Sequence, residues 1–133
     1  MTIGAMQSAA SAVSAGLWWT AASATNVANA GVERAVGQDA PQVTRVQLAE
    51  RPGGGVTATG TSAPGDAVPV HDPESPLADA QGYVQRPGIQ SPAELAEMLI
   101  ASAFVAANVV TLRTASEAYL SAAKLGVEQT ERS

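Results

Sequence analysis

His71, Asp72, Glu74 and Asp79 are the side chains of this sequence whose types and closeness suit chemistry. Imidazole and carboxylate groups together bind transition metals or transfer protons. The chain has one histidine and no cysteine, however, so a metal site would lack a second nitrogen ligand and any sulfur ligand. No candidate nucleophile adjoins His71 in the sequence. We therefore interpret this segment as a solvated, hydrogen-bonded loop, and we expect no enzyme and no catalytic, metal-binding or cofactor-binding residues.

A run of glycines is the second motif that bears on chemistry. Glycine-rich loops that cradle phosphate lead into a Lys-Ser/Thr pair and a helix. Neither follows Gly53-Gly54-Gly55 in this sequence. The run is therefore predicted to be a mobile turn.

The composition limits the size of the core and the kinds of partner. The 133 residues predict a single domain, 1–133, and the low aromatic content of 4% leaves burial to Ala, Val and Leu. A net charge of −5, with seven basic residues scattered along the chain, argues against nucleic acid or an anionic membrane as the partner. The first charged side chain is Glu33. Because the uncharged start has no basic segment and is interrupted by several serines, we expect neither a cleaved secretory signal nor membrane insertion.

The last third of the chain is predicted to be one long helix, 91–128. Ser91-Pro92-Ala93-Glu94 has the pattern of a capping box, in which the glutamate reaches back to the cap. At about 1.5 Å per residue the helix would be roughly 50 Å long, which favours a position beside a partner. A seam of mostly apolar residues recurs at the coiled-coil spacing of three and four residues. They are Leu95, Met98, Ser102, Val105, Val109, Leu112, Ser116, Tyr119 and Ala123.

A second amphipathic helix is predicted for residues 1–30. Its stripe at the same spacing consists of Ile3, Met6, Ala10, Val13, Leu17, Thr20, Ala24 and Val27. Because these side chains are mostly small, we expect the helix to be ordered only when it is packed. Trp18 and Trp19 point in different directions, so one of them must face another surface, either in the core or between subunits. Asn26, Asn29 and Gly31 suit a helix C-cap, and the run 27–30 suits equally a packing motif that admits a close neighbour.

Residues 31–90 have a different character. Seven of the eight prolines and eight of the twelve glycines lie between Glu33 and Ile89, which excludes continuous helix. Residues 42–48 alternate as a strand does, and residues 55–60 give a weaker strand, so a two-stranded ribbon is predicted. Prolines keep residues 68–84 extended or in turns, with Tyr83 and Val84 holding them to a helix. The predicted fold is mainly α: long N- and C-terminal helices packed as an antiparallel coiled coil, joined by an extended Pro/Gly-rich segment with at most a small β-ribbon.

Three stretches of the chain carry family motifs. Residues 26–30 read Asn-Val-Ala-Asn-Ala, residues 72–84 read Asp-Pro-Glu-Ser-Pro-Leu-Ala-Asp-Ala-Gln-Gly-Tyr-Val, and residues 98–102 read Met-Leu-Ile-Ala-Ser, followed by Ala-Asn at 107–108. These motifs resemble bacterial flagellar axial proteins and, within that family, proximal rod proteins of the FlgC type. The middle motif is the specific one, since the first also fits hook and distal rod proteins. The chain departs from the family at Ala103 and Val105, where the family has arginine and tyrosine.

The resemblance implies a structural subunit of the flagellar basal body. Such subunits pack their two helices antiparallel, and copies stack with other rod proteins into the periplasm-spanning drive shaft that transmits motor torque. Export would use the flagellar type III apparatus, without a cleaved signal. A small helical adaptor and another axial subunit, of hook or distal rod type, stay open as alternatives. The residues expected to pack or to form interfaces are Leu17, Trp18, Asn26, Asn29, Tyr83, Leu95, Met98, Val105, Asn108, Val109 and Leu112.

Overall fold

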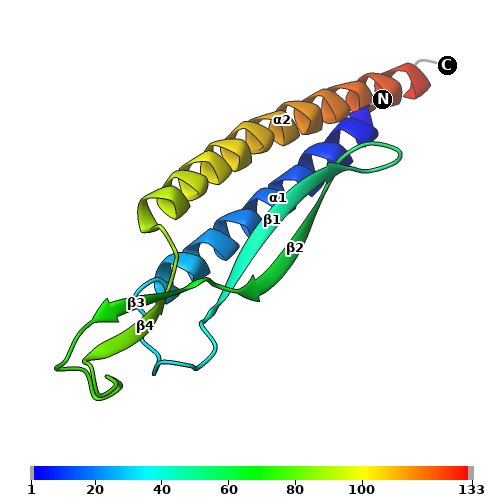
Figure 1. Cartoon of the computed structure of the whole chain (residues 1–133). Helices are drawn as coiled ribbons and strands as arrows, with labels where there is room; N and C mark the ends of the chain where they lie inside the picture. The colour runs from blue at the N-terminus through cyan, green and yellow to red at the C-terminus, as the bar shows by residue number, and fades with distance from the viewer. Residues whose placement is uncertain (1, 132–133) are drawn as a thin grey trace.

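The computed structural model describes residues 2–131, with side chains from residue 3 to residue 127. Its elements are α1 (Thr2–Asn29), β1 (Gln42–Glu50), β2 (Val56–Pro64), β3 (Ala67–His71), β4 (Tyr83–Pro87) and α2 (Ser91–Glu131). The two helices lie side by side and run in opposite directions, and the β1–β2 hairpin lies along α1 (Figure 1). The long terminal helices and the β-containing link are confirmed. The fold is mixed α and β, however, rather than mainly α as predicted.

The predicted ribbon is present and longer than expected. β1 pairs with β2 in one antiparallel register from Gln42↔Pro64 to Glu50↔Val56. Gly53, Gly54 and Gly55 form the turn with φ values of 90°, 100° and 94°, a conformation that glycine adopts without strain. The turn is docked on α1, because the Val56 N–H donates to Ser11 Oγ at 2.9 Å. The glycine run is thus a turn, as predicted, with a contact that the sequence did not indicate.

A second two-stranded sheet, β3–β4, lies where the sequence predicted only extended chain and turns. Proline normally interrupts a ladder because it has no N–H. Here Pro69 faces Gln85, and the backbone N–H and C=O of Gln85 bond instead to Arg34 on the other side of β4, at 2.8 and 2.9 Å. Pro69 and Gln85 therefore form a non-hydrogen-bonded pair, and the nitrogen of Pro69 points out of the sheet. The proline costs the ladder nothing at this position.

The face of α1 that packs against its surroundings consists of small residues. The buried side chains are Ala9, Ala12, Ala15, Ala22, Ser23 and Asn26. A Cβ atom on Gly16 would lie 2.6 Å from Val105 Cγ2 and 2.9 Å from Phe104 Cδ1, so the glycine lets the two helices approach closely. The predicted stripe overlaps this face only in part, because Met6, Val13 and Val27 are half-buried. Ile3 and Leu17 are more than half exposed. The distance between packed helices follows the side chains at the contact, and this contact selects small side chains rather than the larger apolar ones.

The sequence predicted Ser91 as the N-cap of α2, but Ser91 is already the first residue of the helix. The Gln90 carbonyl accepts the N–H groups of Ala93 and Glu94 at 2.9 and 3.1 Å, which places Gln90 at the cap and Ser91 inside the first turn. The Glu94 carboxylate is bound to Asn26 and Arg45 rather than to the cap. The predicted capping box is therefore wrong, although the position of the helix was predicted correctly.

The buried line of α2 overlaps the predicted seam only in part. Met98, Val105 and Leu112 are half-buried, as a seam requires. Leu95 and Val109 are about half exposed, and the fully buried apolar residue is Ala101, which the predicted seam omits. The most buried residue of this helix is therefore again a small one.

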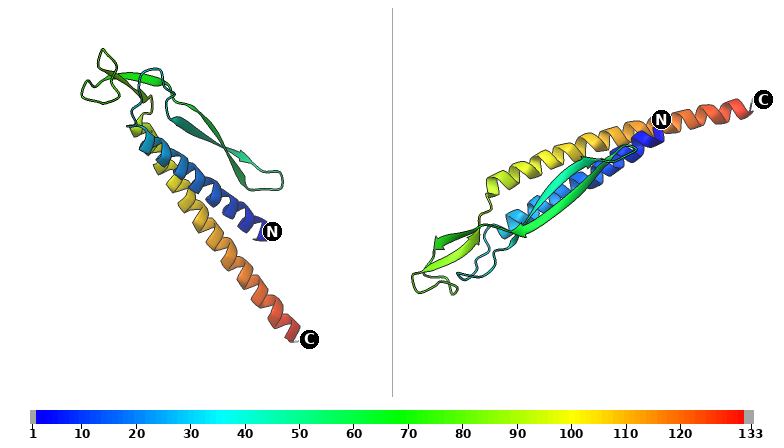
Figure 2. Two further views of the ribbon diagram at one scale, coloured as in Figure 1. Left: turned by 90° about the horizontal axis from the view of Figure 1, so that it is seen from below. Right: turned by 45° about the vertical axis from the view of Figure 1, so that its right-hand side comes forward.

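α2 extends past the N-terminal end of α1 (Figure 2). From residue 118 to residue 127 every side chain is exposed. An 18-residue window of α2 has a mean hydropathy of 1.9, and 6% of it is buried. Length and composition alone would let this helix cross a membrane, a criterion that helices of soluble proteins also meet.

Candidate interaction surfaces

Asn26 joins α1, β1 and α2. Its Nδ2 group donates to the Thr44 carbonyl at 2.9 Å and to Glu94 Oε2 at 3.0 Å, and its Oδ1 accepts the Thr44 N–H at 2.9 Å. The side chain is fully buried and uses both ends of its amide. Neither the C-cap nor the packing motif predicted for this stretch describes this role. Asn26 lies within α1, before the end of the helix, and its hydrogen bonds go to β1 and α2. The last helical residue is Asn29, whose carbonyl accepts the Val32 N–H at 3.0 Å.

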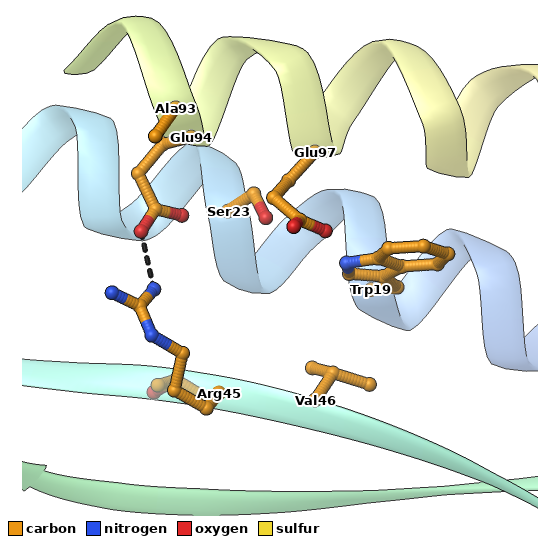
Figure 3. A pocket seen from close by; sticks show the side chains of 8 residues that line it. Trp19, Ser23, Arg45, Val46, Ala93, Glu94 and Glu97 are labelled. Carbon is orange, nitrogen blue, oxygen red and sulfur yellow. Dashed lines mark hydrogen bonds and ion pairs between the residues drawn. The ribbon is translucent and has the colours of Figure 1, made fainter. Parts of the chain in front are cut away.

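Glu94 is a buried carboxylate at the junction of α1, β1 and α2. Its side chain is 4% exposed, whereas its ion-pair partner Arg45 is 62% exposed. A carboxylate removed from water needs charged or hydrogen-bonding partners, and Arg45 and Asn26 supply them. A pocket opens beside this ion pair, between the helices and β1 (Figure 3). Its lining residues are Trp19, Ser23, Thr44, Arg45, Val46, Ala93, Glu94 and Glu97.

The two tryptophans both face the β1–β2 ribbon. Trp18 covers Gly60 of β2, where a Cβ atom would collide with the indole ring. Trp19 lines the pocket beside β1.

A second polar cluster fastens β4 to the segment that follows α1. The Arg86 guanidinium donates to Glu33, and Ser75 Oγ donates to Glu33 Oε2 at 2.9 Å. Asp72 Oδ2 lies 3.9 Å from Arg86 Nη2. Hydrogen bonding from Arg86, followed by that from Ser75, lowers the pKa of the Glu33 carboxyl. The cluster holds the loop after β3 in place.

The loop that contains the candidate acid–base residues is organised by its own hydrogen bonds. Asp79 Oδ1 accepts the backbone N–H groups of Gln81 and Tyr83 at 2.9 Å each, as expected for an aspartate that fixes a turn. The His71 ring meets the Tyr83 ring edge to face, with centroids 5.1 Å apart. Among the described side chains, those of residues 3–127, no group of three or more His, Asp or Glu is placed to hold a metal ion.

The helix pair presents a broad uncharged surface. No charged residue occurs from 2 to 32, and none occurs between Glu97 and Arg113. On this stretch of α2, Leu99 is 73% exposed and Val110 is 65% exposed, and Ile100 is also largely exposed. A surface helix of a monomer normally carries charged or polar residues on its outer face. This face instead has the character of a surface that another molecule covers.

The structure places the predicted interface residues in three groups. Asn26 is fully buried. Half-buried positions are Asn29, Met98, Val105, Asn108 and Leu112. Exposed positions are Leu17, Trp18, Tyr83, Leu95 and Val109. The second and third groups leave apolar surface available for contact with another molecule.

Sequence reasoning missed the partners of Asn26. Thr44 belongs to a predicted strand, and Glu94 was assigned to a cap, so no local pattern links either of them to Asn26. The available signal was an amide side chain on a helix rich in alanine and serine, because such a group needs a partner when it is buried. No protein-family model matches this chain, and no curated protein sequence matches it.

Proposed function

We propose that this protein is a structural subunit of the flagellar proximal rod, built to assemble with copies of itself and with other rod proteins through its helix pair. The observation that carries the proposal is the uncharged, exposed apolar face formed by α1 and by α2 between Glu97 and Arg113. The three motifs that resemble rod proteins supply the assignment to a particular assembly. Within each subunit, we propose that the helices pack as an antiparallel coiled coil, the arrangement the resemblance implies.

The polar side chains on this face suit burial in an assembly. Ser14, Thr20 and Thr25 of α1 donate to the carbonyl four residues earlier, at 3.1, 2.9 and 2.9 Å. In α2 the Asn108 and Thr111 side chains do the same, at 2.8 and 3.0 Å. A hydroxyl that is bonded within its own helix can lose its water without becoming an unsatisfied group. A neighbouring subunit therefore meets a surface whose dehydration costs little.

The first test is made on the purified chain. Leu99→Glu places a charge on the uncharged face but outside the contact between α1 and α2, so the fold should be retained, as checked by circular dichroism. We expect wild-type protein to self-associate in sedimentation velocity as its concentration is raised, and Leu99→Glu to remain monomeric. Thr114→Glu, on an exposed part of α2 that already has charged neighbours, is the matched control and should associate like wild type.

The second test is made in the bacterium that encodes the chain. Deletion should remove rods, hooks and filaments from isolated basal bodies and should abolish motility, and Leu99→Glu should reproduce that loss. Asn29→Leu should also block assembly by widening the small-residue end of α1. Complete rods in a non-redundant deletion strain would rule out the rod role and favour the helical adaptor. Insertion of the purified chain into lipid vesicles, without self-association, would instead assign the apolar face to a membrane.

A further inference from the structure

The edge of β1 that does not pair with β2 has hydrogen-bond partners at Thr44 but, among the described residues, none at Val46, two residues farther along the strand. Thr44 gives its N–H to the Asn26 amide and accepts one from it, at 2.9 Å each, as two residues of an antiparallel ladder do. Thr44 and Ser62 are therefore a non-hydrogen-bonded pair, in agreement with the 2.9 Å contact of their hydroxyls. The Asn26 side chain stands in for a peptide group of a third strand.

The same ladder geometry fixes the direction of the Val46 backbone groups. The register with β2 is regular along the whole of β1, so positions two residues apart point to the same edge. The N–H and C=O of Val46 consequently face outward beside the Asn26 amide. Within residues 2–131 these two groups have no hydrogen-bond partner. An exposed edge of this kind is a template for another strand.

The pocket beside the ion pair lies along this stretch of edge. It encloses about 320 Å³ between the Thr44–Val46 segment of β1 and the side chains of Trp19 and Glu97 (Figure 3). This volume falls at the lower end of the range of ligand pockets. A volume of this size admits a short stretch of extended chain rather than a whole helix, which is about 10 Å wide.

The charges around the pocket select the side chain that such a segment should carry. Glu94 is neutralised by Arg45. Glu97 is exposed and forms no hydrogen bond or ion pair with any described residue, which leaves one negative charge at the pocket. The indole of Trp19 lies next to the Glu97 carboxylate (Figure 3). A cation placed beside the Glu97 carboxylate would be attracted by its negative charge.

We propose that this pocket binds an extended segment of a partner polypeptide, which adds to the outer edge of β1 at Val46 and places a lysine or arginine side chain beside Glu97 and Trp19. Main-chain hydrogen bonds to the edge would supply affinity, and the cation would supply selectivity. The proposal does not rest on the rod assignment, because it concerns the junction of α1, β1 and α2 rather than the uncharged face of the helix pair.

The experiment titrates the full-length chain with three capped peptides and follows backbone amides by NMR. The first peptide alternates valine and lysine, the second has glutamate in place of lysine, and the third is the lysine peptide with alternate main-chain nitrogens methylated. We expect saturable binding of the first peptide with the largest amide shifts at Thr44 to Val46. The other two should bind at least about tenfold more weakly, since each loses charge-assisted or main-chain hydrogen bonds.

Two variants locate the cation. Glu97→Gln should weaken the lysine peptide about tenfold and remove most of the salt dependence of its binding. Glu117→Gln, an exposed carboxylate farther along α2 that pairs with Arg113, is the matched control and should bind like wild type. Equal affinity for the methylated peptide would overturn strand addition, and equal affinity for the glutamate peptide would overturn the cation site. Absence of saturable binding by the lysine peptide would overturn the proposal as a whole.

Discussion

The helix pair and the β region of this molecule are held by different kinds of contact. In the helix pair small residues occupy buried positions, such as Ala101 and Gly16, the latter closely approached by Val105. Around the strands, contact is made by hydrogen bonds and ion pairs such as Glu33 with Arg86 and Asn26 with Thr44. The two kinds of contact meet at Asn26, which belongs to a helix and binds a strand.

This difference teaches what each region is sensitive to. A contact between small residues depends on shape, because a single methyl group decides whether two backbones can approach. A polar contact depends on the presence of its partner, because a buried polar group without a partner is costly. An ion pair also depends on pH, because its carboxylate must be ionised. Substitutions and pH should therefore separate the two regions.

The largest effect is expected at the junction of the two regions. Asn26→Ala removes three hydrogen bonds and leaves the buried Glu94 carboxylate with fewer partners, so we expect a loss of about 3 kcal/mol in the free energy of unfolding. Urea denaturation measures it. Asn29→Ala, in the same motif, is the control and should cost less than about 0.5 kcal/mol. Equal losses for the two variants would mean that Asn26 has no special role.

The next effect tests the shape dependence of the helix contact. Gly16→Ala would place a methyl group 2.6 Å from Val105 Cγ2, and we expect a loss of about 1–3 kcal/mol from overpacking. Gly4→Ala is the matched helical glycine, with no atom within 4 Å of the added Cβ. It should stabilise the protein by about 0.5–1 kcal/mol, through helix propensity alone. Thermal unfolding of both variants checks the opposite signs, and stabilisation by both would contradict the close approach.

A smaller effect concerns the pH dependence of the β region. The pKa of Glu33 is lowered in the folded protein by Arg86 and Ser75, so folding favours the ionised carboxylate. The stability that ionised Glu33 contributes is fully present above the unfolded carboxyl pKa of about 4.3. It is lost as the pH falls through the lowered pKa of Glu33 in the folded protein. The measurement is the melting temperature at pH values on both sides of about 4.3. As the pH is lowered, it should fall less steeply for Glu33→Gln than for wild type. Parallel curves would show that the cluster contributes no pH dependence.

The smallest effect is expected where neither kind of contact operates. Arg113 Nε and Glu117 Oε1 lie 3.0 Å apart on the exposed part of α2. An exposed pair at this spacing contributes about 0.3–0.5 kcal/mol. Glu117→Gln should therefore lower stability by no more than this, and added salt should abolish the difference. A loss above about 1 kcal/mol would show that the pair is buried in an assembly.

Much of the architecture could be predicted from local patterns, whereas the contacts between elements could not. The positions of α1, α2 and the β1–β2 ribbon followed from periodicity, proline and glycine, which act over a few residues, although the ribbon extends beyond its predicted limits. The β3–β4 sheet was missed because the effect of Pro69 depends on which way its nitrogen points in a ladder. The packing face of α1 was missed because large apolar residues were favoured over Gly16 and its alanine neighbours. The partners of Asn26 lie 18 and 68 residues away, beyond any local pattern.

Residues 118–127 of α2 form an overhang that extends past the N-terminal end of α1 (Figure 2). This overhang gives the helix a gradient of local stability along its length. Its first turns share the Glu94 junction, its middle packs against α1, and its residues 118–127 are exposed on all sides. An isolated helical segment this short is marginal in water, so the backbone of the overhang should open far more often than the rest. In the monomer, amide hydrogen exchange should be slowest near Ala101 and should quicken steadily toward Val127. A partner that covers the overhang would slow exchange there first, which makes this end of the helix the most sensitive reporter of assembly.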